Sequence, residues 1–300
     1  MAKPLTSALD FIGRHGRGLT LANIATQGGI IVTGGLVRLT SSGLGCSTWP
    51  QCEPGQFTPT LHGETAGHQA IEFGNRTVTF VLLLVAGLLA IAIWRTRPDL
   101  KWWGIVPVAG VFAQAIVGGI TVRADLNPWI VGPHMMISVA LVWIAVYIAL
   151  RYRHAPGRLG QPLRWERAAH AVAFVAVIVL GVLTTGAGPH SGDADATERL
   201  ALDPAHIARF HSMAAWLFML TLGLLIWRVR RDRSEGDRDE VRKSWIVLGA
   251  VTLAQGVIGY VQYFTGLPIA VVALHLAGIA LLAAAESAFW FLTKNSVPVA

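Results

Sequence analysis

The sequence predicts an all-α integral membrane protein with eight transmembrane helices arranged as two pseudo-symmetric four-helix bundles. Hydrophobic residues make up 53% of the chain and charged residues only 14%, which is too apolar for a soluble protein of this size. The apolar residues gather in long runs, and the second half of the chain repeats the pattern of the first. Because the backbone must satisfy its own hydrogen bonds inside hydrocarbon, each spanning run is predicted to be a helix.

Eight apolar windows each come close to the roughly 20 residues that a helix needs to cross a bilayer. They are residues 19–38, 72–94, 103–122, 131–150, 168–187, 205–227, 244–263 and 269–292. The first window is long and does not end in a site for cleavage by a signal peptidase. We therefore expect it to remain as the first membrane helix.

The positive charges predict the orientation of the helices. All but five of the 24 Lys and Arg residues lie in the two terminal tails or in the loops after the second, fourth and sixth windows. The five others are Arg38, Arg76, Arg123, Arg199 and Arg209. Cytoplasmic loops carry the excess of Lys and Arg, so we predict a multi-pass protein of the plasma membrane with both termini in the cytoplasm. The basic charge indicates contact with anionic membrane lipid, and no nucleic-acid partner is expected.

An internal repeat divides the chain into two predicted domains. Residues 113–119 read AQAIVGG and residues 254–260 read AQGVIGY, and each run is followed by another apolar segment with a His near its start. Each half has four windows, so both halves share one orientation and are related by an axis along the membrane normal. We predict an N-terminal four-helix bundle at 1–150 and a C-terminal four-helix bundle at 151–300.

Histidines recur at matching places in this repeat. His134 matches His275, whereas the counterpart of His211 is Asn75. Ionisable residues within membrane spans are rare and usually face a bundle interior. Two facing helices that each present a His at the same depth can hold a haem iron by its two axial positions, as His211 and His275 could. Most of the other histidines, among them His170 on the cytoplasmic side, are interpreted as solvated.

Glu72 is a second residue that is unfavourable in a membrane span. It lies three positions before Asn75 on the same helix face, and its counterpart in the second half is Ala208. One interpretation is a charge at the membrane boundary, where the energetic penalty is small. The other is a carboxylate that accepts a proton or stabilises positive charge. In that case one site does chemistry while the other holds a permanent cofactor.

The long external segment 39–71 holds both cysteines of the chain. Cys46 and Cys52 lie within GLGCSTWPQC, and in an oxidising compartment two cysteines so close together are candidates for a disulfide. The bridge would either staple a loop rich in Gly and Pro or take part in redox or site-covering chemistry.

Four arginines form a further group at the outer ends of the predicted helices. They are Arg38, Arg76, Arg123 and Arg209. Arginine is well suited to bind the anionic propionates of a haem. The alternative is that these side chains extend to lipid headgroups.

Five segments together resemble haem A synthase. They are GGLVRLTSSGLGCSTWPQC at 34–52, IEFGNR at 71–76, GPHMMIS at 132–138, FHSMAAWL at 210–217 and ALHLAG at 273–278. The likeness runs from about residue 20 to about residue 290 and is most specific in the loop that carries the cysteines.

The resemblance implies an oxidoreductase that converts haem O to haem A for cytochrome oxidase assembly. It oxidises a ring methyl group to a formyl group. By the same resemblance, His211 and His275 hold haem b with its iron in the C-terminal bundle. The N-terminal bundle binds the substrate haem, and its matching residues are Glu72, His134 and Asn75.

One departure from the family pattern lies at Asn75, where the family commonly has His. A neutral amide is a poor iron ligand. Either His134 alone binds the substrate iron and leaves its other face open, or His68, about two turns before Asn75, moves in. The family's paired external cysteines fall on Cys46 and Cys52.

The resemblance also implies partners. They are haem O, an unidentified electron acceptor and, as a hypothesis, the enzyme that produces haem O. Two other functions stay open: a non-catalytic b-type electron-transfer cytochrome of the membrane, and a carrier or transporter of haem. A pure cytochrome would keep His ligands in both halves, and a transporter would be expected to have interrupted helices at the midplane.

Overall fold

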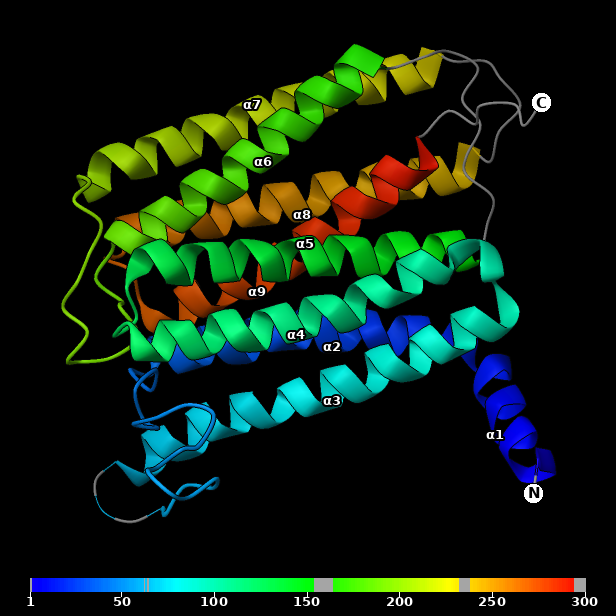
Figure 1. Ribbon diagram of the computed structural model, residues 1–300. Coiled ribbons are helices and arrows are strands. Elements are labelled where there is room, and N and C mark those ends of the chain that lie inside the picture. The colour runs from blue at the N-terminus through cyan, green and yellow to red at the C-terminus, as the bar shows by residue number, and fades with distance from the viewer. Residues whose placement is uncertain (1, 62, 64, 154–163, 232–237, 294–300) are drawn as a thin grey trace. The chain divides into compact units, whose positions relative to one another are not determined.

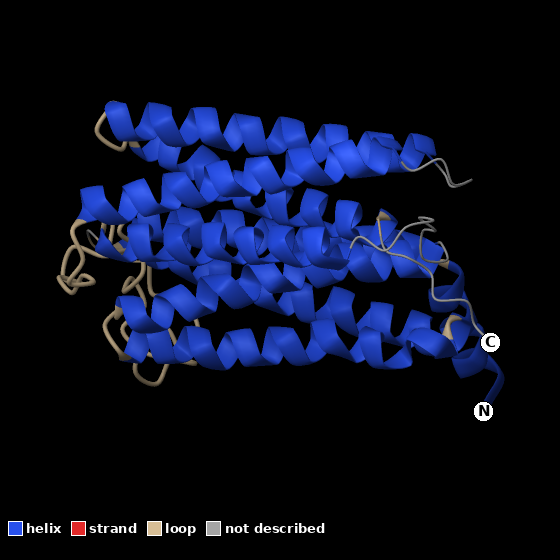
Figure 2. Cartoon of the chain, turned by 90° about the horizontal axis from the view of Figure 1, so that it is seen from above, coloured by secondary structure: helices blue, strands red, loops and turns tan. Residues whose placement is uncertain are grey.

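The computed structural model describes residues 2–293 apart from 62, 64, 154–163 and 232–237 (Figure 1). In this part of the chain the secondary structure is helical and no strand forms (Figure 2). Eight of the described helices are long and apolar enough to cross a membrane, and each predicted window lies inside one of them. The prediction of an all-α membrane protein with eight spans is therefore confirmed. Part of the predicted basic loop between the two halves lies outside the described residues.

The helices form two compact units. Unit 1 comprises Met1–Arg153 together with Gly188–Leu200, and unit 2 comprises His154–Ala187 together with Ala201–Ala300. The segment Gly188–Leu200 thus follows the first helix of unit 2 in the chain but packs with unit 1.

Unit 1 is built around a ring of four long helices. Its elements are α1 (Ala2–Arg14), α2 (Gly16–Leu39), α3 (Ala66–Thr96), the short 3-10 helix η1 (Pro98–Leu100), α4 (Lys101–Arg123) and α5 (Pro128–Arg153). Helices α2 and α4 each pack against both α3 and α5, so every long helix has two neighbours in the ring. Helix α1, which the sequence analysis did not predict, contacts α3, where Arg95 donates to Asp10 at 2.5 Å.

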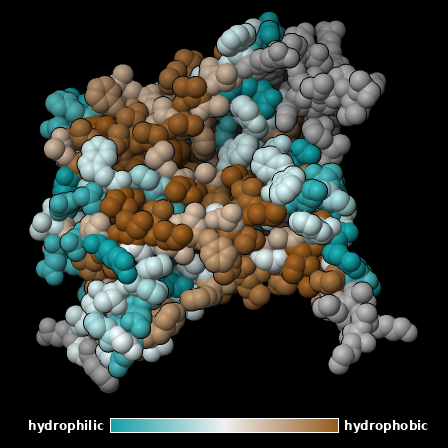
Figure 3. Space-filling model, viewed as in Figure 1, coloured by the Kyte–Doolittle hydropathy of each residue, from teal (hydrophilic) through white to brown (hydrophobic). Residues whose placement is uncertain are grey.

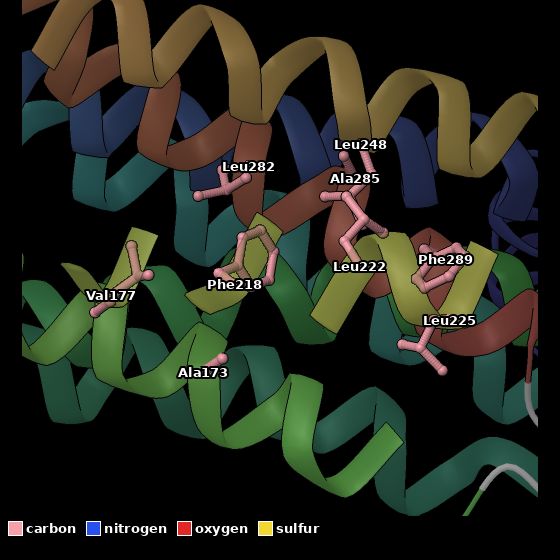
Figure 4. Packing of buried hydrophobic residues seen from close by; sticks show 10 residues of the cluster. Ala173, Val177, Phe218, Leu222, Leu225, Leu248, Leu282, Ala285 and Phe289 are labelled. Carbon is pink, nitrogen blue, oxygen red and sulfur yellow. The ribbon is translucent and has the colours of Figure 1, made fainter. Parts of the chain in front are cut away.

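Unit 2 consists of two helix pairs. Its helices are α6 (Arg164–Ala187), α7 (Pro204–Arg231), α8 (Arg238–Phe264) and α9 (Ile269–Leu292). Helix α6 packs along α7 and α8 packs along α9, while α7 makes a smaller contact with α8. Buried apolar side chains of all four helices meet in one core, which includes Phe218, Leu222, Leu248, Leu282 and Phe289 (Figure 4).

Two of the helices that carry candidate ligands start in the same way. At the start of α5, the Trp129 N–H donates to Oδ1 of Asn127, and the N···O distance is 2.9 Å. At the start of α7, the His206 N–H donates to Oδ1 of Asp203, and the N···O distance is 2.7 Å. A proline follows each capping residue and occupies the first helical position, where its missing N–H would have no partner. These caps define where α5 and α7 begin, and hence the depth of the histidines that follow.

The surface of the helices suits a lipid environment. In the view of Figure 3, hydrophobic side chains cover the middle of the helices and hydrophilic ones gather toward their ends. Large apolar residues along the spans are exposed, among them Leu84, Ile116, Leu220 and Leu281. Contiguous apolar surface of this kind is rare on soluble monomers and is expected where lipid tails contact the protein.

Candidate functional site

Two histidines of unit 2 face each other across the bundle interior. The ring centre of His211 on α7 lies 6.3 Å from that of His275 on α9, and the ring planes are at 87°. Two imidazoles that bind one metal from opposite sides have ring centres about 6 Å apart, because each metal–nitrogen bond is about 2 Å long. The observed separation therefore fits a pair of axial ligands on a single metal centre.

The backbone of α6 selects which nitrogen of His211 is free to bind a metal. The Nδ1 atom of His211 lies 3.1 Å from the carbonyl oxygen of Val177. A ring nitrogen next to a carbonyl must donate, so Nδ1 carries the hydrogen and Nε2 keeps its lone pair. Metal-binding histidines are commonly oriented by such a bond.

Glycines leave room for two of the candidate ligands. A Cβ atom at Gly259 on α8 would lie 3.5 Å from Cε1 of His275, and a Cβ at Gly118 on α4 would lie 3.4 Å from Cε1 of His134. Gly118 and Gly259 occupy matching positions in AQAIVGG and AQGVIGY. The repeat therefore preserves both the histidine and the small residue that its ring packs against.

His134 lies in unit 1, and α4 holds its backbone. Nε2 of Gln114 donates to the carbonyl oxygen of His134 at 3.0 Å and also to Oγ of Ser138. The Nδ1 atoms of His134 and His275 are buried without a hydrogen-bond partner among the described residues. An unpaired ring nitrogen inside a membrane bundle is unfavourable, and a ligand with polar or metal groups at the ring would relieve the penalty.

Asn75, the counterpart of His211 in the repeat, is an amide that already has a hydrogen-bond partner. Oδ1 of Asn75 accepts a hydrogen bond from Oγ1 of Thr33 on α2 at 2.7 Å. Nδ1 of His68 lies 3.0 Å from Oγ of Ser42 at the end of α2. Asn75 thus bonds to the C-terminal half of α2, and His68 bonds to a residue just after that helix.

Glu72 is a buried, ion-paired carboxylate. Its Oε2 accepts the backbone N–H of Cys46 at 2.7 Å. Its Oε1 accepts Nε and Nη2 of Arg76 at 3.1 and 2.5 Å. The side chain of Glu72 is 6% exposed and that of Arg76 is 15% exposed. Glu72 is therefore buried and hydrogen-bonded directly to the segment that carries the cysteines.

The two cysteines are paired in the structure. Cys46 and Cys52 form a disulfide with an S–S distance of 2.05 Å, and both residues are fully buried. We call residues 46–52 the disulfide loop. The disulfide itself is therefore packed into unit 1, while Ser47, Pro50 and Gln51 of the loop are exposed.

Two of the arginines considered for propionate binding contact the disulfide loop. Nη1 of Arg76 donates to the carbonyl oxygens of Thr48 and Gln51 at 2.9 and 3.1 Å. Nη2 of Arg123 donates to the carbonyl oxygen of Trp49 at 3.0 Å. These bonds tie the loop to α3 and α4 at the same end of unit 1.

The other two arginines have different surroundings. Arg38 is half-buried at the end of α2 in unit 1. Arg209 is exposed near the start of α7 in unit 2, two residues before His211. Among the four arginines, Arg209 is thus the one on the same helix as His211.

The segment 188–200 covers the same end of unit 1. The Gly43 N–H donates to the carbonyl oxygen of Gly192 at 2.7 Å, and Nδ2 of Asn127 donates to Oε2 of Glu198 at 2.6 Å. Asn127 also caps α5, as described above. The segment therefore contacts both the start of the helix that carries His134 and the loop after α2.

Comparison with known proteins assigns the family. A model of the family described as cytochrome oxidase assembly protein matches residues 17–286. This chain belongs to that family. The matched range contains the facing histidines of unit 2 as well as Glu72, His134 and the disulfide loop of unit 1.

Curated relatives within this family are named Heme A synthase. The relative from Lysinibacillus sphaericus is 25% identical over 295 residues, which cover 90% of this chain and 93% of the relative. The relative from Listeria monocytogenes is 27% identical over 268 residues, which cover 82% of this chain and 85% of the relative. The match to the relative from Geobacillus thermodenitrificans is 29% identical but covers only 42% of this chain and 40% of that relative's length.

One buried pair of this cytochrome oxidase assembly protein was missed in the sequence analysis. His170 on α6 and Glu286 on α9 are 0% and 2% exposed, and Nε2 of His170 lies 3.0 Å from Oε2 of Glu286. The interpretation of His170 as a solvated residue is therefore wrong. The available signal was Glu286, because a carboxylate within a strongly apolar span must find a partner.

Proposed function

We propose that this protein is a haem A synthase, which oxidises a ring methyl group of haem O to a formyl group. The observation that carries the proposal is the facing pair His211 and His275, whose separation fits the axial ligands of one iron. Unit 1 adds a buried histidine, His134, and the buried carboxylate of Glu72. The names of the relatives support the same reaction.

In this proposal His211 and His275 hold haem b in unit 2. Val177 keeps His211 in the tautomer that leaves Nε2 free for iron. Within the described residues, no three His, Cys, Asp or Glu side chains lie close enough to hold a metal ion. A metal bound by two histidines must therefore bring its other ligands, as the iron of a haem does. A haem with two histidine ligands supplies electron transfer, because no coordination position is open.

Unit 1 takes the substrate haem. His134 is its protein ligand, and Gln114 fixes the backbone that carries the ring. Asn75 and His68 are engaged by Thr33 and Ser42, which supports a single histidine ligand on this side. The second face of the substrate is then free of a strong protein ligand.

Glu72 is the proton acceptor of the reaction. Oε1 accepts two hydrogen bonds from Arg76, whereas Oε2 accepts one from Cys46. A carboxylate oxygen accepts about two hydrogen bonds, so Oε2 retains one site for a proton from the reacting group. Arg76 holds the carboxylate in one orientation, and the disulfide loop covers it from solvent.

The overall reaction determines how many protons and electrons the site must remove from the substrate. With water as the net oxygen source, the methyl group and one water give the formyl group, four protons and four electrons. The carbon passes through an alcohol and then a hydrated aldehyde, which loses water. Glu72 would receive protons at the reacting edge, and the four electrons would pass to an external acceptor.

The charge pattern and the substrate suggest the cellular setting. We place the protein in the plasma membrane with both termini in the cytoplasm, because the Lys and Arg residues are concentrated at that end of the helices. The disulfide loop then faces the oxidising side. Haem O is poorly soluble in water, so direct transfer from the enzyme that produces it is part of the proposal.

The ligand assignment is tested by the haem content of the full chain in mild detergent. Reduced-minus-oxidised spectra and chromatography of extracted haem are expected to reveal haem b in the wild type. His211→Ala should lose the b-type signal, and the matched control His206→Ala, at an exposed position on the same helix, should keep it. A wild type without haem, or haem that is unchanged in His211→Ala, would overturn the assignment.

The reaction is tested by conversion of haem O. Glu72→Gln should retain bound haem and stall conversion, because the amide preserves shape but does not take up a proton. His134→Ala should lose substrate haem while keeping haem b. Bound haem b without any haem O turnover in the wild type would identify an electron-transfer cytochrome instead.

A further inference from the structure

His170 and Glu286 lie deep in the core of unit 2, away from the facing histidines. His170 is seven residues before Val177 on α6, and Val177 is the residue that contacts His211. At 1.5 Å per residue, this spacing corresponds to about 10 Å along the helix. The pair is therefore near the cofactor site of unit 2 without being part of it.

The hydrogen bonds of His170 define how many protons the pair holds. Oγ1 of Thr221 lies 2.9 Å both from the carbonyl oxygen of Phe218 and from Nδ1 of His170, and in the arrangement where its one hydrogen goes to the carbonyl it accepts from Nδ1. Nδ1 must then carry a hydrogen. The remaining bond, 3.0 Å between Nε2 and Oε2 of Glu286, needs one more hydrogen between the two atoms. Whichever atom carries it, the pair is neutral overall and holds one exchangeable proton.

The surroundings of the pair are apolar. The ring of His170 stacks on Phe218 at 4.5 Å between centres and meets the edge of Phe289 at 6.0 Å. Phe218 and Phe289 belong to the apolar core of unit 2, which also includes Ala173 and Leu248 (Figure 4). In such surroundings solvent screens charges only weakly, so the affinity of the pair for the shared proton responds to a change of charge on a neighbouring group.

Among the described residues of unit 2, the charged groups near the pair lie toward the end of the bundle where α6 begins. Glu166, one turn before His170, forms an ion pair with Arg228 of α7 at 3.1 Å. Arg167 of α6 donates to the carbonyl oxygen of Trp290 on α9 at 3.0 Å. Within the described part of unit 2, α7 presents the neutral Thr221 to the ring, and α9 presents Glu286. The polar end of the bundle therefore lies about one helical turn from the pair and offers the shortest route to water.

We propose that His170 and Glu286 form a proton-binding site that takes up and releases its proton as the iron held by His211 and His275 changes oxidation state. The inference rests on the haem b site proposed above. When the iron gains one electron, the pair takes up one proton from water at the end of the bundle where α6 begins. When the iron loses the electron, the proton returns by the same route. The electron donor is the substrate methyl group in the reaction and a small redox mediator in the test.

The physical reason for this coupling is electrostatic. Ten residues separate His211 from Thr221, the residue of α7 that contacts His170, which corresponds to about 15 Å along the helix. At about 15 Å, two unit charges interact by about 1 kcal/mol at an effective dielectric constant of 20, which exceeds the thermal energy. An added electron on the iron favours a proton nearby, and an oxidised iron disfavours it. The proton on the pair offsets the charge of the electron on the iron, so placing the electron in an apolar bundle has a smaller electrostatic penalty.

The test is the pH dependence of the haem b midpoint potential in the full chain, by spectroelectrochemical titration. The wild-type potential should fall as pH rises over part of the range. Glu286→Gln and His170→Gln can each keep one hydrogen bond across the pair but remove the proton that the two side chains share, so their potentials should lose most of this dependence. The matched control Glu166→Gln removes an acid on the same helix whose partner is Arg228, and it should keep the wild-type slope.

The outcomes separate the two proposals. A wild type without haem b overturns the haem b site and this inference together. Haem b with a pH-independent potential, or with a slope that survives in both Gln variants, overturns this inference alone. A surviving slope would assign the proton to other groups, such as the haem propionates. If the variants fail to fold, the proton uptake of the wild type is measured during reduction in weakly buffered solution. The absence of uptake would contradict the inference.

Discussion

The backbone N–H of Cys46 donates a 2.7 Å hydrogen bond to Oε2 of Glu72. This bond joins the disulfide loop to the carboxylate at the start of α3, which also pairs with Arg76. The loop, the acid and the arginine therefore form one connected group at the end of unit 1. A change in the loop is expected to reach Glu72 directly.

The first prediction concerns Arg76. Arg76→Gln removes the ion pair to Glu72 and the bonds to two loop carbonyls, leaving a buried carboxylate without its partner. Loss of one member of a buried pair typically destabilises a protein by about 3 kcal/mol. We expect faster proteolysis of segment 39–71 and reduced haem O conversion. Arg209→Gln, at an exposed position, serves as the control, and equal proteolysis rates in the two variants would contradict the predicted role of Arg76.

The second prediction concerns the space beside His211. A Cβ at Gly181 would lie 2.9 Å from Cε1 of the His211 ring, which the Val177 carbonyl holds in place. Gly181→Ala should displace the ring at a penalty of about 1–3 kcal/mol, which corresponds to at least a roughly fivefold loss of haem b affinity. Gly223→Ala on α7, where a Cβ would meet nothing within 4 Å, is the matched control. Full haem b content in both variants would refute the steric argument.

The third prediction tests how Gln114 supports the substrate site. Gln114→Leu keeps the approximate size but removes the hydrogen bonds to the His134 carbonyl and to Ser138. A neutral hydrogen bond contributes about 1 kcal/mol, so haem O binding should weaken roughly five- to thirtyfold. The haem b content of the same sample is the internal control. Parallel loss of both haems would point to general unfolding, and unchanged haem O binding would exclude the positioning role.

The fourth prediction is a pH dependence at the start of α7. The His206 N–H bonded to the Asp203 carboxylate lowers the pKa of that group below its usual value. A lowered pKa contributes stability that is present above the unfolded pKa and is lost as pH falls through the folded pKa. The difference in thermal midpoint between wild type and Asp203→Ala should therefore be largest near neutral pH and shrink in acid.

Asp203→Asn provides the control for this cap. The amide can still accept the His206 N–H but does not titrate over this range. Its difference from Asp203→Ala should stay constant with pH. If the wild type and Asp203→Asn differ from Asp203→Ala with the same pH profile, titration of Asp203 is not the cause.

Membrane spans and candidate ligands could be predicted because their signals are local. A stretch of about 20 apolar residues must form a helix in hydrocarbon whatever surrounds it, and every predicted window lies within an observed span. The short separation of Cys46 and Cys52 made a bridge the natural expectation, and the structure pairs them. Helix α1 was missed because 13 residues of mixed polarity carry no such signal.

The same reasoning could not predict which side chains form hydrogen bonds with one another. The sequence predicted Glu72 beside a haem site but not the partners of its oxygens, which are Cys46 and Arg76 from two different segments. His170 was interpreted as solvated because its helix position is close to a basic loop. Its partner Glu286 is 116 positions away, and no local pattern links the two.

The amino-acid order therefore established which segments enter the membrane and which ionisable groups must be accommodated there. Those outcomes follow from the transfer of each segment from water to hydrocarbon, which depends on composition and length. The separation of His211 from His275, the burial of Glu72 under the disulfide loop and the pairing of His170 with Glu286 came only from packing. Hydrogen bonds act over about 3 Å, so they depend on how distant segments meet in space.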